Sequence, residues 1–257
     1  MRMMILTVAL TAGLIPISVA QDTLPQASLD RETSLQGRDR TGACSLPRQT
    51  SAPPPYCKPC LFYAGDFDSN ASDANGLANE VDLIVSTGAA VYTPFVVPKG
   101  KTWTVTGLFT NNFLFALTID PKVTPYEIRK GIPKAGGSGG KLVCHGIRPA
   151  TLVDTGTCFP TYATIVKNIK GCRLPAGKYW MSVVPYCTNP NDSACANSWR
   201  SFLANDDGAM AHRFGPLEPA NNSFFNSVFF GAVWEPSSKE QSSARFSVGV
   251  EGTSTGK

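Results

Sequence analysis

The residues best suited to chemistry lie in one polar segment, Gly65 to Glu80, which reads GDFDSNASDANGLANE. Its carboxylate and amide side chains are closely spaced on a turn-rich stretch: Asp66, Asp68, Asn70, Asp73 and Asn75. A cation such as Ca²⁺ takes roughly six to eight oxygen ligands, which such side chains can supply. The EF-hand pattern fails, because Ala71 replaces its glycine and Leu77 its closing acidic residue. Because Asp, Asn and Gly also dominate ordinary turns, the sequence favours a solvated surface turn, with a structural calcium site as the alternative.

A second candidate for binding is Trp199, which lies in the polar run Asn197-Ser-Trp-Arg-Ser201. The tryptophans in strand-like runs are predicted to pack in the core instead: Trp103, Trp180 and Trp234. Aromatic ring faces bind the apolar side of sugar rings through buried area. We therefore expect Trp199 to contact a ligand such as an extracellular glycan.

Patterns with catalytic spacing lack the context that their chemistry needs. Cys57-Lys-Pro-Cys60 resembles a thioredoxin-type redox motif, but no helical periodicity follows it, and that chemistry needs a cysteine at a helix N-terminus. Residues 136–140 match G-x-S-x-G without the strand and helix of a nucleophile elbow. His145 and His212 are too few for the usual zinc site.

Glycoside hydrolysis would need two facing carboxylates. Glu127 alternates outward between Tyr126 and Ile128, beside Arg129, and this favours a solvated sheet face. The sequence thus favours a protein without a catalytic site. A secreted hydrolase that acts on polysaccharide is the alternative.

Cysteine usage indicates an oxidising compartment. The eight cysteines all follow residue 20: Cys44, Cys57, Cys60, Cys144, Cys158, Cys172, Cys187 and Cys195. An even count after an export signal is typical of disulfides. Cys187 and Cys195 bracket a polar loop and form the predicted local pair, while the cysteines between residues 144 and 172 could staple strands together.

Residues 1–20 read as a secretory signal peptide. Arg2 supplies the positive charge, Met3 to Ile17 the apolar core, and Ser18-Val19-Ala20 the small residues before cleavage. A membrane anchor is the alternative, but the apolar run is short and is interrupted by Gly13 and Pro16. We expect an exported protein, secreted or periplasmic, without a membrane span after cleavage. The formal net charge is +4, and the sequence contains no run of lysine and arginine residues. Both observations argue against nucleic-acid binding.

Residues 21–60 are polar and proline-rich, and we interpret them as a disordered leader because they cannot bury enough apolar surface. Residues 61–257 form the predicted β domain. Its clearest stretch is Tyr92 to Ile119, where large side chains recur at every second residue. We expect two antiparallel strands joined at Asn111-Asn112, a bulge at Gly107, and turns at 98–100 and 174–177.

Short alternating runs separated by turn residues, without a convincing helix pattern, predict an all-β fold. A β-sandwich, and within that class a jelly roll, is the architecture that we expect. Disulfides are expected to stabilise this fold.

Two motifs carry a family resemblance. FVVPKGKTWTVTGL and the later LPAGKYWMSVVP resemble a broad group of exported bacterial β-sandwich proteins with F-x-V-P-x-G-x-x-W-x-V and L-x-A-G-x-Y-W-x-x-V. LPAGKYW also resembles the bacterial pre-peptidase C-terminal domain, a jelly roll that accompanies secreted enzymes, whereas FFNSVFFG fits the first group better. The resemblance covers Phe62 to Val250. It implies fold and export, and no catalytic residue carries over.

These observations favour an exported, non-catalytic binding or accessory protein. Its expected partner is an extracellular polymer such as glycan, or a surface protein. A purely structural envelope or matrix protein is a further alternative.

Overall fold

The computed structural model describes residues 52–66, 76–82, 87–113, 123–132, 137–155, 161–187, 209–211, 223–227, 233–237 and 246–256. Most of them are in strands, which confirms the all-β prediction. The strands are β1 (Cys60–Tyr63), β2 (Gly76–Ala78), β3 (Glu80–Asp82), β4 (Thr87–Phe113), β5 (Thr124–Lys130), β6 (Lys141–Arg148), β7 (Ala150–Asp154), β8 (Thr161–Lys167), β9 (Arg173–Val183), β10 (Tyr186–Cys187), β11 (Ala209–Ala211), β12 (Phe224–Ser227), β13 (Val233–Pro236) and β14 (Val248–Thr255). Within these ranges no helix has the length and hydropathy to cross a membrane.

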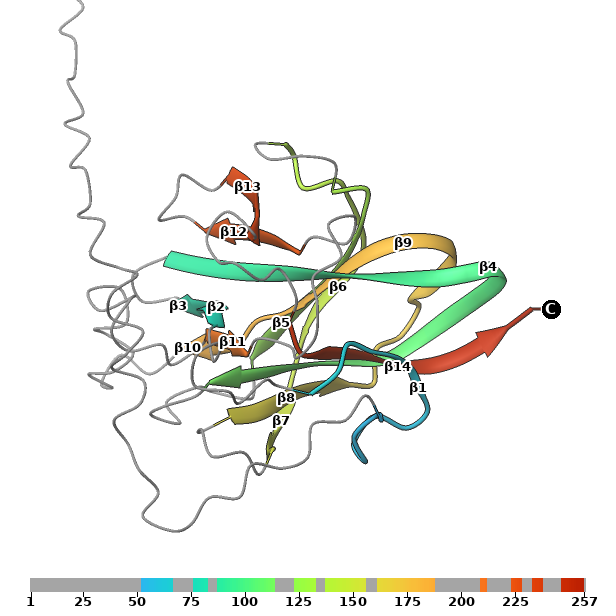
Figure 1. Cartoon of the computed structure of the whole chain (residues 1–257), viewed down its shortest axis with the longest axis horizontal. Coiled ribbons are helices and arrows are strands. Elements are labelled where there is room, and N and C mark those ends of the chain that lie inside the picture. Colours follow the sequence, from blue (N-terminus) through green and yellow to red (C-terminus); the bar gives the residue numbers. More distant parts are fainter. Residues whose placement is uncertain are drawn as a thin grey trace, which may run out of the picture.

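One long strand, β4, contributes to two layers (Figure 1). Its residues 87–97 pair with β3, β9 and β12, and β9 continues to β5 and β6; these strands, with β13, are the first layer. Its residues 102–113 pair with β8, β11 and β14. β7 pairs with β8, and β1 pairs with β14; these strands together are the second layer. Pairing is antiparallel except between β3 and β10. The strand order does not establish a jelly roll, which stays a prediction.

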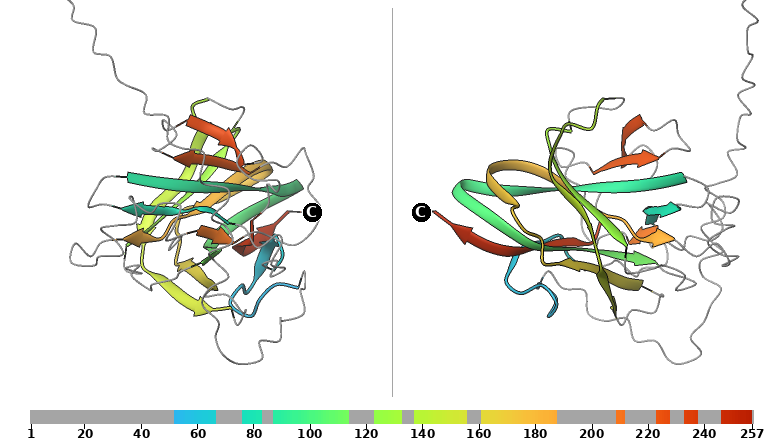
Figure 2. Two further views of the ribbon diagram at one scale, coloured as in Figure 1. Left: turned by 60° about the vertical axis from the view of Figure 1, so that its left-hand side comes forward. Right: turned by 180° about the vertical axis from the view of Figure 1, so that it is seen from behind.

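The two layers are joined where β4 and β9 bend together, at the end of the molecule opposite β3 and β10 (Figure 2). The register between the two strands shifts there from Val97↔Gly177 to Thr102↔Pro175. Gly100 has a φ of 80°, in the region that side chains disfavour. The two turns predicted from the sequence are therefore one shared corner, and the two motifs of the family resemblance pair with each other.

The main core lies between the layers and is built by alternate residues of the strands. In β4, Val91, Phe95 and Val97 belong to it. Phe95 stacks with Trp103 and Tyr179, at ring-centroid distances of 5.9 and 5.7 Å. Other inward positions predicted from period 2 are also buried here: Val105, Tyr126, Ile128, Met181, Val183, Phe246, Val248 and Val250. Each large apolar side chain so buried contributes about 1.5–3 kcal/mol.

The hairpin predicted at Asn111-Asn112 is wrong, because β4 runs through both residues and pairs there with β8. Asn112 accepts a hydrogen bond from Asn79 Nδ2 at 3.0 Å and donates to the hydroxyls of Thr110 and Thr164 at 2.8 and 3.1 Å. Asparagine favours turns when it is solvated, whereas here strand neighbours satisfy its buried amide.

The bulge predicted at Gly107 is confirmed. Glu251 pairs with Gly107, and the next residue of β14, Gly252, pairs with Val105, so that Thr106 is the additional residue. A Cβ at Gly107 would lie 3.1 Å from a backbone oxygen of β8. Glycine therefore permits a close approach of the two strands.

The described chain begins at Ala52, before the predicted start of the β domain at Leu61. Residues 52–66, the N-terminal strap, cover the outer face of the second layer. Their side chains pack on that face in the strap cluster, which consists of Tyr56, Cys57, Cys60, Tyr63, Phe109, Val153, Ala163 and Ile165. The predicted signal peptide and the leader up to residue 51 lie outside the described residues.

Two disulfides are present in the described ranges, Cys57–Cys60 and Cys144–Cys172. The second joins β6 to the residue before β9, as expected for a bridge that staples strands. The remaining cysteine side chains, and with them the predicted Cys187–Cys195 pair, lie outside the described residues: Cys44, Cys158, Cys187 and Cys195.

Candidate functional site

The outer face of the first layer carries a second group of buried apolar side chains, the outer aromatic cluster: Tyr92, Ile132, Trp180, Phe224 and Trp234. Tyr92 alternates with the core residues of β4, and Trp180 with those of β9. The rings of Tyr92 and Trp234 lie 4.6 Å apart, and those of Trp180 and Phe224 lie 6.2 Å apart. Aromatic side chains thus form a floor on the side of the sheet that faces away from the main core.

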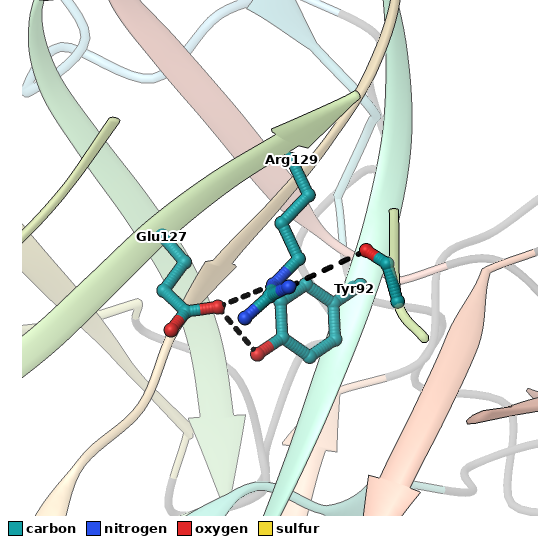
Figure 3. A network of polar contacts seen from close by, with 4 residues as sticks. Tyr92, Glu127 and Arg129 are labelled. Carbon is teal, nitrogen blue, oxygen red and sulfur yellow. Dashed lines mark hydrogen bonds and ion pairs between the residues drawn. The ribbon is translucent and has the colours of Figure 1, made fainter. Parts of the chain in front are cut away.

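A charged pair lies on this floor (Figure 3). Oε2 of Glu127 accepts hydrogen bonds from Nε of Arg129 at 2.6 Å and from the hydroxyl of Tyr92 at 2.8 Å. The guanidinium carbon of Arg129 lies 4.9 Å from the ring centroid of Trp234 and 5.7 Å from that of Tyr92. Cation–π contact and the ion pair therefore fix the same guanidinium.

The bond between Tyr92 and Glu127 spans the strand between them. Tyr92 is on β4 and Glu127 on β5, and both strands pair with β9. Ser182 of β9 lies directly opposite Glu127, and its buried hydroxyl has no hydrogen-bond partner in the described part of the chain. A small residue at this position leaves room for the phenol ring to cross the sheet.

The Gly-rich loop between β5 and β6 closes the other side of the guanidinium. Nη1 of Arg129 lies 3.4 Å from the carbonyl oxygen of Gly139. Gly139 has a φ of 72°, and a Cβ there would lie 2.2 Å from the ring of Trp234. The loop that matches G-x-S-x-G therefore has a packing role at Gly139, where only glycine fits.

The surroundings favour the protonated forms of Tyr92 and Arg129. Burial, followed by the negative charge of Glu127 and its hydrogen bond, raises the pKa of Tyr92 well above its ordinary value. Burial alone would lower the pKa of Arg129, but the hydrogen bond and charge of Glu127 outweigh it and raise that pKa. The side chains of Arg129 and Glu127 remain 17% and 29% exposed. A charged pair whose carboxylate accepts a hydrogen bond from a buried phenol thus faces solvent from an apolar floor.

The predicted metal ligands are mostly outside the described residues: Asp68, Asn70, Asp73 and Asn75. Asp66 is described, at the end of the strap, and its Oδ1 accepts a hydrogen bond from the hydroxyl of Tyr63. No three His, Cys, Asp or Glu side chains of the described ranges gather closely enough to hold a metal ion. Calcium therefore stays a hypothesis from the sequence.

Among the tryptophans, Trp103, Trp180 and Trp234 are buried, as predicted. Trp199 lies outside the described residues. Glu127 does face outward, but it bonds Tyr92 and Arg129 instead of being simply solvated. The sequence signal for this site was the alternation in β5, which places Glu127 and Arg129 on one face; the contact with Tyr92 had no local signal.

Comparison of the chain with protein-family models, with curated protein sequences and with solved structures gave no match. The function therefore has to be argued from the geometry of the outer face.

Proposed function

We propose that this protein is an exported, non-catalytic binding protein that holds an extracellular polymer such as glycan. The observation that carries the proposal is the pair of Glu127 and Arg129 on the aromatic floor of the first layer. Export is supported by the signal-like residues 1–20 and by the disulfides of the described ranges.

The pair offers the two hydrogen-bonding functions that a sugar diol requires. A carboxylate accepts from a hydroxyl, and a guanidinium donates to one. Oε2 of Glu127 is used by Tyr92 and Arg129, while Oε1 makes no hydrogen bond to the described residues. The outer edge of the guanidinium and Oε1 can therefore meet neighbouring hydroxyls, and fixed polar groups bind without loss of side-chain entropy.

The same arrangement favours binding over hydrolysis. Glycoside hydrolysis uses two carboxylates, one of them as an acid. Here the carboxylate of Glu127 accepts hydrogen bonds from the guanidinium of Arg129 and from the phenol of Tyr92. This set of mutually hydrogen-bonded groups suits holding a ligand.

A glycan array with purified chain tests the proposal. We expect wild-type binding to at least one polysaccharide class, and about tenfold weaker binding in Arg129→Met and in Glu127→Gln, since each loses a charge-assisted hydrogen bond. Arg148→Met is the matched control, because Arg148 is an exposed arginine of β6 whose guanidinium donates a hydrogen bond to the carbonyl oxygen of its neighbour Ile147.

The outcomes separate the alternatives. Absence of wild-type binding to every glycan would reject the proposal. Binding that survives Arg129→Met and is lost in Trp199→Ala would move the contact to the segment predicted from the sequence. Turnover of a polysaccharide that Glu127→Gln abolishes would replace binding with hydrolysis.

A further inference from the structure

The two described disulfides have different surroundings. Cys144 and Cys172 are 9% and 1% exposed and both belong to the main core between the layers. In the other bridge, Cys57 is 2% exposed, whereas Cys60 is partly exposed. Lys58 and Pro59, which lie between these cysteines, are exposed. A reagent in solution can therefore reach the Cys57–Cys60 turn but not the core bridge.

The accessible bridge lies where the strap is attached to the second layer. The carbonyl oxygen of Pro59 accepts a hydrogen bond from the backbone N–H of Gly252 at 3.0 Å, and Cys60 pairs with Glu251 of β14. The ring of Tyr56, next to Cys57, packs edge-on against Phe109 at 5.1 Å. These contacts hold the strap without help from the bridge.

The bridge closes a very small loop. Cys57 and Cys60 are separated by three positions, and Cys144 and Cys172 by 28. Restriction of the unfolded chain grows with loop length, so the short bridge stabilises the fold less than the long one. The bridge therefore contributes little to stability and is accessible to solvent, so that it can be opened while the fold stays intact.

We propose that Cys57–Cys60 is a site of thiol–disulfide exchange with an external dithiol, while Cys144–Cys172 is inert. A thiolate of the dithiol attacks Sγ of Cys60, the S–S bond breaks, and the electron pair and a proton go to Sγ of Cys57. The second thiol of the reagent then attacks the mixed disulfide and releases Cys60 as a thiol. The protein gains two electrons and two protons, and the dithiol becomes a disulfide.

The site is a substrate for exchange and differs from a thioredoxin-type catalyst. A catalytic cysteine of that type is acidified by a helix N-terminus, whereas Cys60 is the first residue of strand β1. Lys58, between the two cysteines, is exposed, and Nζ of Lys167, which lies 3.4 Å from the carbonyl oxygen of Tyr56, is paired with Glu251 at 3.0 Å. Exchange here depends on the access of an incoming thiolate.

Graded reduction of the full, oxidised chain tests the proposal. Samples are equilibrated with increasing dithiothreitol, quenched with N-ethylmaleimide and mapped by mass spectrometry. We expect Cys57 and Cys60 to be alkylated at a reductant concentration about tenfold or more below that for Cys144 and Cys172, with the circular dichroism of the native fold unchanged. Simultaneous reduction of both bridges, or reduction of Cys57–Cys60 only when the native signal is lost, would overturn it.

Two single variants identify the sulfur that is attacked. Cys57→Ser leaves Cys60 as a thiol, and Cys60→Ser leaves Cys57. We expect the Cys60 thiol to react with N-ethylmaleimide about tenfold faster than the Cys57 thiol, because Cys57 is buried against β14. Equal rates, or a faster Cys57, would contradict the assigned order. The thiol reactivity tested here does not depend on glycan binding, so failure of the proposed binding function would not alter the outcome of this experiment.

Discussion

The outer faces of the two layers both bury aromatic side chains, but the chain covers them in different ways. On the first layer, the aromatic floor is covered by the long side chains of Glu127 and Arg129 and by the loop at Gly139. On the second layer, Phe109 is covered by the N-terminal strap. Each layer uses one face for the main core, so apolar residues on the other face need a cover. On the first layer, the covering side chains present polar groups to solvent, which suits ligand recognition. On the second layer, the covering strap presents an accessible disulfide to solvent.

The largest expected difference between the regions concerns the disulfides. Replacing Cys144 and Cys172 together with alanine should lower the free energy of unfolding by about 3–4 kcal/mol, whereas the same change at Cys57 and Cys60 should cost about 2 kcal/mol. Equilibrium urea denaturation measures both values. Equal losses would show that the short bridge holds the strap as firmly as the long bridge holds the core.

Glycine substitutions test how tightly each cover is packed. Gly139→Ala should cost about 2–4 kcal/mol, because its φ is 72° and the added Cβ overlaps Trp234. Gly249→Ala, on the second layer, should cost about 1–3 kcal/mol through overlap with Phe109. Gly131→Ala is the control, since its φ is 67° and nothing lies within 4 Å; it should cost about 1 kcal/mol. If Gly139→Ala matched Gly131→Ala, the floor would have free space.

Alkaline titration probes the strap. Burial, followed by the charge of Asp66, raises the pKa of Tyr56 from its ordinary value to about 12. The unfolded chain releases this proton near pH 10, so the stabilisation is present below pH 10 and is lost as pH rises toward 12, by about 1.4 kcal/mol per pH unit. Urea denaturation between pH 9 and pH 12 measures the slope. Tyr56→Phe should reduce it, and an unchanged slope would show that Tyr56 ionises freely.

Calcium should have the smallest effect, and it concerns the end of the strap. If the Asx-rich segment binds calcium, a concentration tenfold above Kd raises the free energy of unfolding by about 1.4 kcal/mol. Thermal melting in calcium and in chelator measures this, and Asp66→Asn should reduce the difference. Equal melting temperatures would remove the hypothesis.

The periodic part of the fold could be predicted from sequence. Phe246, Val248 and Val250, and the outward position of Glu127, follow from alternation within single strands. The corner shared by β4 and β9 was predicted as two separate turns, because its pairing joins residues far apart in the chain. The contact of Tyr92 with Glu127 was not predicted for the same reason: it depends on which strand lies between them.

The first described strand pairs with the last, since β1 lies against β14. β1 therefore has no strand partner until β14 has been synthesised, and the second layer cannot be completed before then. Pairing over such a distance makes folding slow. A chain with this order stays partly unfolded until β14 has been synthesised, which suits passage through a translocation channel on the exported route that we propose.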